Sequence, residues 1–413
     1  MDFEDTPEEA AFRKQVRAWL EANAPKGAGA GMFSANLNEA EALKIARAWQ
    51  AKKAAAGYAK ITWPKEFGGM GGTGIQNVIY SQEEANYNIP GGFFDIGLGM
   101  CIPTVMAHGK PEHLERYVKP ALYGEEIWCQ LFSEPAAGSD LAGIRMRAER
   151  EGGEGGDWIV NGQKIWTSGA HYSDFGIVVT RSDPTVPKHK GLTFFFVDMK
   201  SPGIEVKPIK QISGGANFNE VFFTNVRIPD SQRLGKVGDG WKVSLTTLMN
   251  ERLAIGGGGG ALGTDQLIEL ARKTIMPDGQ PAIRNAAVRE KLADWYVQGQ
   301  GLKYTRFRSL TALSKGQTPG PENSIGKAVS AQRGQDYSAF AMELMDMGGI
   351  LNEAELVHYK AGFQASWLMA PAMRIAGGTD EILKNIIAER VLGMPGDIRV
   401  DKDIPYNQSP GVK

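Results

Sequence analysis

The length, composition and charge of the chain exclude several classes of protein. The chain has 413 residues and a mass of 44.8 kDa, enough for one large domain or two to three ordinary ones. Hydrophobic residues make up 42% of it, which supports a sizeable core and excludes a disordered chain. Lys and Arg total 46 against 47 Asp and Glu, so the net charge of −1 gives no reason to expect nucleic acid as a partner.

Targeting features and cysteine usage favour the cell interior. The first residues, Met1 to Asp5, are acidic and lack the apolar region of a signal peptide. No stretch approaches about 18 uninterrupted apolar residues, so we expect no membrane span. The two cysteines, Cys101 and Cys129, cannot form a disulfide framework and are not spaced as zinc ligands. We therefore expect a cytoplasmic globular protein without a metal site.

The first 126 residues have the pattern of a helical region. Phe12, Val16, Trp19 and Leu20 recur at helical spacing and predict a helix over residues 8–21. The glycine-rich run 63–72 breaks the helical pattern and predicts a loop. Further helices are predicted at residues 39–56, 76–87, 98–108 and 112–122.

The pattern changes to short strands near Ile127. Asn161-Gly162 stands between two apolar runs, which predicts a β-hairpin with its turn at these two residues. Further strands are predicted at residues 175–180, 192–198, 204–209 and 221–228. Regular short strands separated by Gly and Pro indicate an antiparallel barrel or sandwich that ends near Gly235.

Helical spacing returns after Gly235. Trp241, Leu245, Leu248 and Ile255 would form one face of a helix, and the chain after Arg399 lacks any pattern and looks loose. More helices are predicted at residues 288–314, 324–345, 354–368 and 380–392. The order predicts an α+β protein: an N-terminal helical domain (1–126), a middle antiparallel β-barrel or sandwich domain (127–235) and a C-terminal helical domain (236–413) built on a four-helix bundle.

Three segments carry residues suited to a polar ligand. Residues 131–140 form a strand end followed by a glycine- and hydroxyl-rich loop, although a tight structural loop explains them equally well. In residues 162–170, a tryptophan followed by two hydroxyls could pack against a flat ring, or belong to an ordinary strand with a core Trp. In residues 374–385, two glycines lead into a helix start that could receive a phosphate or ribose, or be capped by Thr379.

Together, these segments resemble the signature regions of the acyl-CoA dehydrogenase family. Residues 133–140 with the Trp166 segment look like the first signature, and residues 377–392 look like the second. Three other stretches are similar to the family's N-terminal loop, its middle helices and its entry into the C-terminal bundle: residues 63–69, 108–117 and 234–241. The resemblance therefore covers nearly the whole chain in the family's order and spacing.

The resemblance implies a helical–β–helical fold that binds FAD and dehydrogenates an acyl-CoA thioester to a trans-2-enoyl-CoA. It also implies a tetramer, expected here to be a homotetramer although heterotetramers occur in the family. An electron-transfer flavoprotein is the implied electron acceptor.

Carried over residue by residue, the resemblance assigns specific contacts. Ser133 would bond the pyrimidine side of the flavin, Ser168 would face its N5, and Ser139 sits where the family contacts CoA. Arg272 and Thr274 would reach FAD across a subunit boundary. The full set expected to hold FAD is Leu131, Phe132, Ser133, Gly138, Ser139, Trp166, Thr167, Ser168, Arg272, Thr274, Thr379 and Glu381, of which the last two would contact the adenosine half.

The reaction requires a carboxylate base for the α-proton. Many family members carry it immediately before the Gly-Thr of the last signature, where this chain has Gly377. Glu251 lies three residues past Leu248 and four before Ile255, which predicts a position on the apolar face, where desolvation would raise its pKa. This arrangement resembles that of a subset of the family, including isovaleryl- and long-chain-type enzymes, in which the base stands directly before an arginine. Here Glu251 stands directly before Arg252.

The resemblance gives three further residues a role at the substrate. Arg252 matches a family arginine near the CoA end of the cleft, and Gly378 would contact the substrate. The backbone N–H of Gly377, with a ribityl hydroxyl of FAD, would polarise the thioester carbonyl. If Glu251 is not the base, Glu134 and Glu84 are the next candidates.

Several departures keep other functions open. Met345 stands where the family often has a Gln that meets a neighbouring FAD, and Thr274 is followed by Ile275-Met276-Pro277 instead of an aromatic and a glycine. The chain could therefore be a non-catalytic or partner-dependent subunit of a heteromeric enzyme, or a flavin acyl-CoA oxidase. The run Gly256–Gly260 either widens the acyl cavity or permits close helix packing.

Overall fold

The computed structural model describes residues 5–25, 39–87, 89–255, 262–314, 320–353 and 355–410. The chain divides into two compact units. One contains Asp5–Ala254 together with the tail that begins at Asp397, and the other contains Ile255–Gly396. Within the described ranges, no helix combines the length and the apolar character needed to cross a bilayer.

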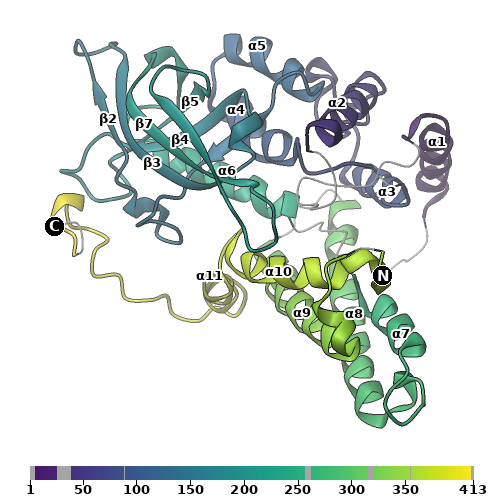
Figure 1. Cartoon of the computed structure of the whole chain (residues 1–413). Coiled ribbons are helices and arrows are strands. Elements are labelled where there is room, and N and C mark those ends of the chain that lie inside the picture. Colours follow the sequence, from purple (N-terminus) through teal and green to yellow (C-terminus); the bar gives the residue numbers. More distant parts are fainter. Residues whose placement is uncertain are drawn as a thin grey trace. The chain divides into compact units, whose positions relative to one another are not determined.

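Five α-helices precede the first strand, and their positions confirm the predicted helical region (Figure 1). They are α1 (Pro7–Asn23), α2 (Glu39–Ala55), α3 (Gly74–Glu84), α4 (Ile102–His108) and α5 (Pro111–Leu122). Thr6 caps α1, since its hydroxyl accepts from the Glu9 N–H while the Glu9 carboxylate accepts from the Thr6 N–H. The predicted helix 98–108 differs in its first turn, because Gly97–Cys101 form a π-helical turn that leads into α4.

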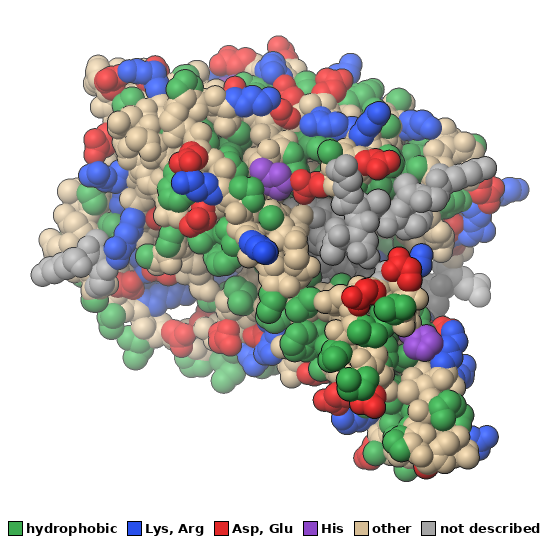
Figure 2. All heavy atoms as spheres, viewed as in Figure 1, with side chains coloured by type: hydrophobic (Ala, Val, Ile, Leu, Met, Phe, Trp, Pro, Cys, Tyr) green, Lys and Arg blue, Asp and Glu red, His purple; other side chains and the backbone are tan. Residues whose placement is uncertain are grey.

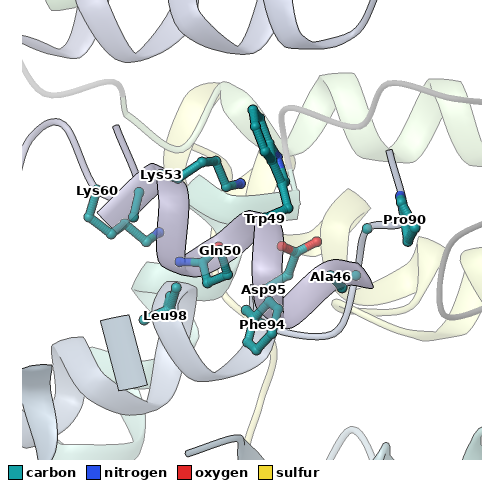
Figure 3. A pocket seen from close by; sticks show the side chains of 12 residues that line it. Ala46, Trp49, Gln50, Lys53, Lys60, Pro90, Phe94, Asp95 and Leu98 are labelled. Carbon is teal, nitrogen blue, oxygen red and sulfur yellow. The ribbon is translucent and has the colours of Figure 1, made fainter. Parts of the chain in front are cut away.

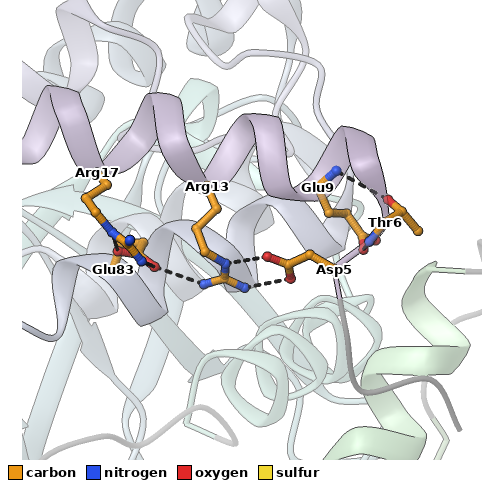
Figure 4. A network of polar contacts seen from close by, with 6 residues as sticks. All are labelled: Asp5, Thr6, Glu9, Arg13, Arg17 and Glu83. Carbon is orange, nitrogen blue, oxygen red and sulfur yellow. Dashed lines mark hydrogen bonds and ion pairs between the residues drawn. The ribbon is translucent and has the colours of Figure 1, made fainter.

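Helices α1 and α3 are joined by a network of charged side chains (Figure 4). The Arg13 guanidinium contacts Asp5 at 2.5 Å and Glu83 at 3.0 Å, and Arg17 contacts Glu83 at 2.9 Å. The Glu83 side chain is only 7% exposed, so the two arginines supply its charge partners where water is scarce.

The middle of the chain forms one sheet of eight strands among the described residues, in the order β6-β7-β3-β2-β4-β5-β8, with β1 beside β4. The strands are β1 (Trp128–Leu131), β2 (Arg147–Arg150), β3 (Trp158–Ser168), β4 (Phe175–Arg181), β5 (Leu192–Asp198), β6 (Ile204–Ile209), β7 (Phe218–Ile228) and β8 (Arg233–Leu234). Antiparallel pairing predominates, as predicted, while β1 and β4 are parallel.

The two faces of the sheet bury different side chains, as the period of two requires. Phe194 and Phe196 of β5 belong to the core that the sheet shares with α4 and α5, whereas Phe195 and Val197 belong to a second core. Helices α4 and α5 therefore cover one face of the sheet. This packing fixes the strand ends from which the loop after β1 begins.

The predicted hairpin turn at Asn161-Gly162 is wrong, because β3 continues through both residues. At this point β7 carries one extra residue, and Asn225 of that bulge has a φ of 50°. The Asn225 N–H donates to the Asn161 side-chain oxygen at 2.8 Å, so the asparagine stabilises the neighbouring strand's bulge. The actual β2–β3 connection is the segment 151–157.

The C-terminal unit is a helical bundle, as predicted. Its helices are α7 (Thr264–Lys273), α8 (Ala286–Ser314), α9 (Asn323–Leu344), α10 (Gly362–Ile375) and α11 (Asp380–Ile386), the last followed by a π-helical turn, Ile387–Val391. Helices α7 to α10 all contribute to one apolar core, which includes Leu270, Leu292, Phe340 and Phe363. The sequence analysis did not predict α7.

The helix predicted at residues 354–368 begins later than expected, and residue 354 lies outside the described residues. Tyr359, Lys360 and Ala361 all have positive φ, near 55°, which interrupts the helix before Gly362. The Tyr359 hydroxyl donates to the Gln266 carbonyl at 3.1 Å, and its ring lies against Phe363. These contacts with α7 and α10 stabilise a conformation that local propensity disfavours.

The tail after Arg399 is also more ordered than predicted. Tyr406 is 5% exposed, and its N–H donates to the Val186 carbonyl at 2.9 Å. The tail is therefore docked on the sheet-containing unit by individual contacts. Such contacts leave no hydrophobic period in the sequence.

Candidate active site

The loop after β1 and the end of β3 come together at Ser133 and Trp166. The Ile165 N–H donates to the Ser133 carbonyl at 2.9 Å. Between Lys164 and Thr167, three steps along β3 span two along β7, so β3 carries an extra residue there. Trp166 has a φ of 61° and is 57% exposed. A bulged tryptophan in the left-handed region is strained, and such strain gathers at functional sites.

A buried ion pair fastens this loop to β3. The Lys164 ammonium, 0% exposed, donates to the Glu134 carboxylate at 2.8 Å and to the Phe132 carbonyl at 3.0 Å. Glu134 also accepts from the backbone N–H groups of Arg145 (2.6 Å) and Met146 (3.0 Å). Burial lowers the pKa of Lys164 while the Glu134 carboxylate raises it. Glu134 is therefore committed to the loop's structure, which weakens it as a candidate base.

Glu84, the other candidate base, is likewise engaged. Its carboxylate accepts from the Trp49 indole N–H at 2.9 Å and from the Tyr80 hydroxyl at 3.1 Å. The Lys53 ammonium lies 3.3 Å from the same oxygen. Its contacts join α2 to α3.

The residues predicted to hold FAD separate into two groups by exposure. Leu131, Phe132 and Thr167 have buried side chains, so only their backbone groups could reach a ligand. The buried Thr167 hydroxyl has no hydrogen-bond partner among the described residues. In the loop after β1 and at the end of β3, the accessible side chains of this set are those of Ser133, Ser139, Trp166 and Ser168, with Gly138 beside Ser139.

The accessible set suits the flavin ring in its chemistry. The indole ring of Trp166 offers a flat apolar surface and contacts only the edge of Phe218 among the aromatic pairs described. Ser133 and Ser168 add hydroxyls that can both donate and accept. Gly138 is exposed, and a side chain there would meet nothing within 4 Å, so the loop leaves room for a ligand to approach its backbone.

Helix α6 (Gly240–Ile255) confirms the predicted apolar face only in part, because Trp241 and Leu248 pack against the core but Leu245 does not. Leu245 is 41% exposed, whereas Val243, Ser244 and Thr247 are 0% exposed. The buried face is thus partly polar: the Thr247 hydroxyl lies 2.9 Å from the Thr104 hydroxyl of α4. Glu251 follows Thr247 by four residues, so it continues this face and is half-buried.

The second signature forms a tight turn before α11. Gly377 and Gly378 have φ values of 68° and 93°, a region that glycine adopts without strain. The Thr379 hydroxyl accepts from the Ile382 N–H at 3.3 Å, so the N-cap predicted as one alternative is present. The Lys327 ammonium donates to the Gly378 carbonyl at 2.5 Å. Gly377 has no side chain that could act as a base.

Three of the remaining predicted residues belong to the C-terminal unit, and the others lie outside the described residues and side chains. The Arg272 side chain is exposed near the end of α7, and Thr274 follows the helix, with its N–H donating to the Leu270 carbonyl at 2.9 Å. Glu381 is exposed in the first turn of α11. The Arg252 side chain and the run Gly256–Gly260 lie outside the described residues.

A cavity of about 110 Å³ lies between α2 and residues 90–98 (Figure 3). Lys53, Lys60 and Asp95 contribute charged side chains to its lining. Burial lowers the pKa of Lys60, and Asp95 partly offsets this. The Lys60 ammonium lies 5.9 Å from the centre of the Trp63 ring and has no hydrogen bond or ion pair among the described residues. Nothing in the loop sequence distinguishes Lys60 from a surface lysine, so the sequence analysis missed it.

Comparisons with known proteins match this architecture along its length. The N-terminal, middle and C-terminal domain models of acyl-CoA dehydrogenase match residues 6–125, 129–226 and 238–392. The acyl-CoA dehydrogenase IpdE1 of Mycolicibacterium smegmatis is 35% identical over 410 residues, which cover 94% of this chain and 98% of that protein.

Two further relatives add to this picture. The acyl-CoA dehydrogenase FadE34 of Mycobacterium tuberculosis is 38% identical over 333 residues, 81% of this chain, but the matched part spans only 44% of that relative's length. The crystal structure of the ChsE4–ChsE5 complex from Mycobacterium tuberculosis has a TM-score of 0.77 at 24% identity, covering 96% of this chain and 100% of that one, and shows the same fold. The chain belongs to the acyl-CoA dehydrogenase family of FAD-dependent oxidoreductases.

Proposed function

We propose that this protein removes the α-proton of an acyl-CoA thioester with Glu251 and yields the trans-2-enoyl-CoA. The observation that carries the proposal is the position of Glu251 on α6, four residues beyond the buried Thr247 and on the same face. A carboxylate that continues a buried face lies partly out of water, where it can accept a proton from a substrate bound against that face. Gly377 offers no competing side chain.

The other expected residues hold and polarise the reactants. FAD, when bound, supplies the acceptor for the hydride that leaves the β-carbon. Ser133, Trp166 and Ser168 contact the flavin ring through hydroxyls and an indole surface, and the Gly377 N–H donates to the thioester carbonyl. Ser139, Arg252 and Gly378 bind the substrate. Arg272, Thr274, Thr379 and Glu381 serve the remainder of FAD.

The assembly and domain limits belong to the same proposal. Domains 1–126, 127–235 and 236–413 would form a homotetramer that passes electrons to an electron-transfer flavoprotein. Large apolar side chains exposed on the C-terminal helices would be available to such an interface: Trp367, Met373 and Ile375 of α10 are 41%, 46% and 65% exposed. Figure 2 shows apolar side chains, in green, across the surface of this helical unit.

The test compares Glu251→Gln with a matched surface variant, Glu115→Gln, whose carboxylate is exposed on α5. We expect Glu251→Gln to keep its flavin absorbance but to lose substrate-driven flavin bleaching by at least about 10²-fold, the lower scale for removal of a general base. Glu115→Gln should match the wild type. Near-normal bleaching in Glu251→Gln would move the base to another residue.

One observation favours a second candidate, a partner-dependent subunit. Met345 and the sequence Ile275-Met276-Pro277 depart from the family at the positions expected to meet a neighbouring FAD. Ile275 is 61% exposed, where the family has an aromatic residue. If the purified chain is colourless and acquires flavin only with a second protein, this candidate replaces the homotetramer. If the protein consumes oxygen when an acyl-CoA is added in air, it is instead an acyl-CoA oxidase.

A further inference from the structure

The C-terminal tail, residues 397–410, contacts the sheet-containing unit beside the exit of the loop that carries Ser133 and Ser139. The Tyr406 N–H donates to the Val186 carbonyl (2.9 Å), and the Asn407 N–H donates to the Pro184 carbonyl (3.0 Å). The family model of the C-terminal domain ends at residue 392 and does not include the tail.

One lysine joins the tail to the loop. The Lys188 ammonium donates to both carboxylate oxygens of Asp140, at 3.0 and 2.9 Å, and to the Asp401 carboxylate at 2.6 Å. Lys188 is 9% exposed, so its ammonium is largely removed from water, whereas the Asp140 side chain remains 59% exposed. Asp140 directly follows Ser139, the residue expected at CoA. A carboxylate of the tail and a carboxylate of the loop thus share one cation.

A second set of contacts holds residues 142–144 at the loop exit. The Arg181 guanidinium, 4% exposed, donates to the carbonyls of Ala142 and Ile144, and the Tyr406 hydroxyl donates to the Gly143 carbonyl at 2.9 Å. The Arg181 guanidinium also lies 3.5 Å from the centre of the Tyr406 ring, a cation–π contact. Three consecutive carbonyls, 142 to 144, are therefore bound by Arg181 or by the tail.

We propose that the tail is a positioning element for the CoA-binding loop, acting through Asp401 on Lys188 and Asp140 and through Tyr406 on Gly143. The proposal rests on the proposed function, since it takes Ser139 as a CoA contact. Gly138, Ser139 and Asp140 are exposed, so their own packing restrains them little. The loop exit, by contrast, is fixed by Arg181, Lys188 and the tail. Without the tail contacts, Ser139 would sample more positions, and CoA would bind more weakly.

The variants are chosen so that the fold survives. Asp401→Ala removes the tail's ion pair, and Asp403→Ala is its matched control, because Asp403 is exposed two residues away and has no ion pair among the described residues. Tyr406→Phe removes the hydroxyl that bonds Gly143 while keeping the ring over Arg181. Asp401→Glu restores a carboxylate and should rescue the first variant.

Three measurements on the FAD-loaded protein test the proposal. For the Asp401→Ala/Tyr406→Phe double variant we expect a KM for acyl-CoA raised by about ten-fold with kcat within about two-fold, since misplacement of a binding group acts on substrate binding first. Calorimetric titration with free CoA should show a matching rise in Kd. Amide hydrogen exchange should accelerate at residues 138–144, and the flavin absorbance should stay unchanged.

Unchanged KM, Kd and exchange in the double variant overturn the proposal, as does a fall in kcat alone. A wild-type protein that binds no CoA also overturns it. The failure of the base assignment is separate: normal bleaching in Glu251→Gln leaves the CoA titration and the exchange result standing.

Discussion

Two lysines of this molecule, Lys164 and Lys60, are both removed from water, but they differ in the groups that surround their ammonium groups. Lys164, in β3, is 0% exposed and donates to the Glu134 carboxylate and the Phe132 carbonyl. Lys60, beside the α2 cavity, is half-buried; it lies near the Trp63 ring and is influenced by the charge of Asp95, without a described hydrogen bond or ion pair. Burial lowers the pKa of both. Lys164 binds the candidate flavin loop to β3. Lys60 lines a cavity, where its N–H groups can donate to molecules that enter it.

The largest expected effect is at Lys164. In Lys164→Met the Glu134 carboxylate would remain buried without a cation, and breaking a buried pair from one side costs about 3–5 kcal/mol of the free energy of unfolding. Urea denaturation followed by circular dichroism measures this. FAD affinity should also fall, because the Ser133 loop loses the Lys164 contacts with Glu134 and Phe132 that help to hold it to β3.

The double variant Lys164→Met/Glu134→Gln serves as the control for Lys164. Removing both charges leaves no uncompensated ion, so the variant should regain most of the lost stability. A cost below about 1 kcal/mol for Lys164→Met alone would contradict the view that this pair fastens the loop.

Lys60→Met should act in the opposite direction. Replacing a partly desolvated ammonium that lacks an acceptor with an uncharged side chain of similar length should stabilise the protein by about 1 kcal/mol, the scale of an unsatisfied polar group. Thermal unfolding at pH 7 measures the gain. Lys65→Met, a change at an exposed lysine in the same loop region, should leave Tm unchanged. A loss of stability in Lys60→Met would mean that Lys60 has a charge partner in solution.

The pH dependence of Lys60 sharpens the same comparison. Its folded pKa is lowered below the ordinary value of 10.5, so the folded state disfavours its charge at neutral pH. This penalty is complete below the folded pKa and disappears as the pH rises through that value toward 10.5. The Tm advantage of Lys60→Met over the wild type should therefore shrink between pH 7 and pH 10. If the Tm advantage of Lys60→Met instead grew with pH, the pKa of Lys60 could not be lowered in the folded protein.

The sequence predicts an element of the fold well when the interactions that form this element lie within one segment of the chain. Most helices and strands follow apolar periods within one segment, and those predictions are confirmed. Three of the failures involve single contacts between residues far apart in the chain, which no local period reports. They are Asn161 with Asn225, Tyr359 with Gln266, and Tyr406 with Gly143.

The candidate site is predictable to a similar degree. Its segments are recognisable from their glycines and hydroxyls, and Ser133 does lie beside the end of β3. The prediction for α6 missed part of its buried face, because Ser244 and Thr247 count as polar in a hydrophobic pattern, yet both are 0% exposed. Their hydroxyls are satisfied by the Gly240 carbonyl and by Thr104, which a pattern of residue types does not reveal.

The network between α1 and α3 in Figure 4 should give an effect no larger than that of Lys60, because its two arginines are partly exposed. Arg13 contacts both Asp5 and Glu83, and its side chain is 23% exposed, whereas Arg17 contacts Glu83 alone and is 57% exposed. Arg13→Met should cost about 1 kcal/mol, near the upper end for exposed pairs, and Arg17→Met should cost less. Urea denaturation of the two variants at low and high salt measures the difference. An equal cost would show that the charge of Glu83, rather than the exposure of each arginine, sets the strength of this network.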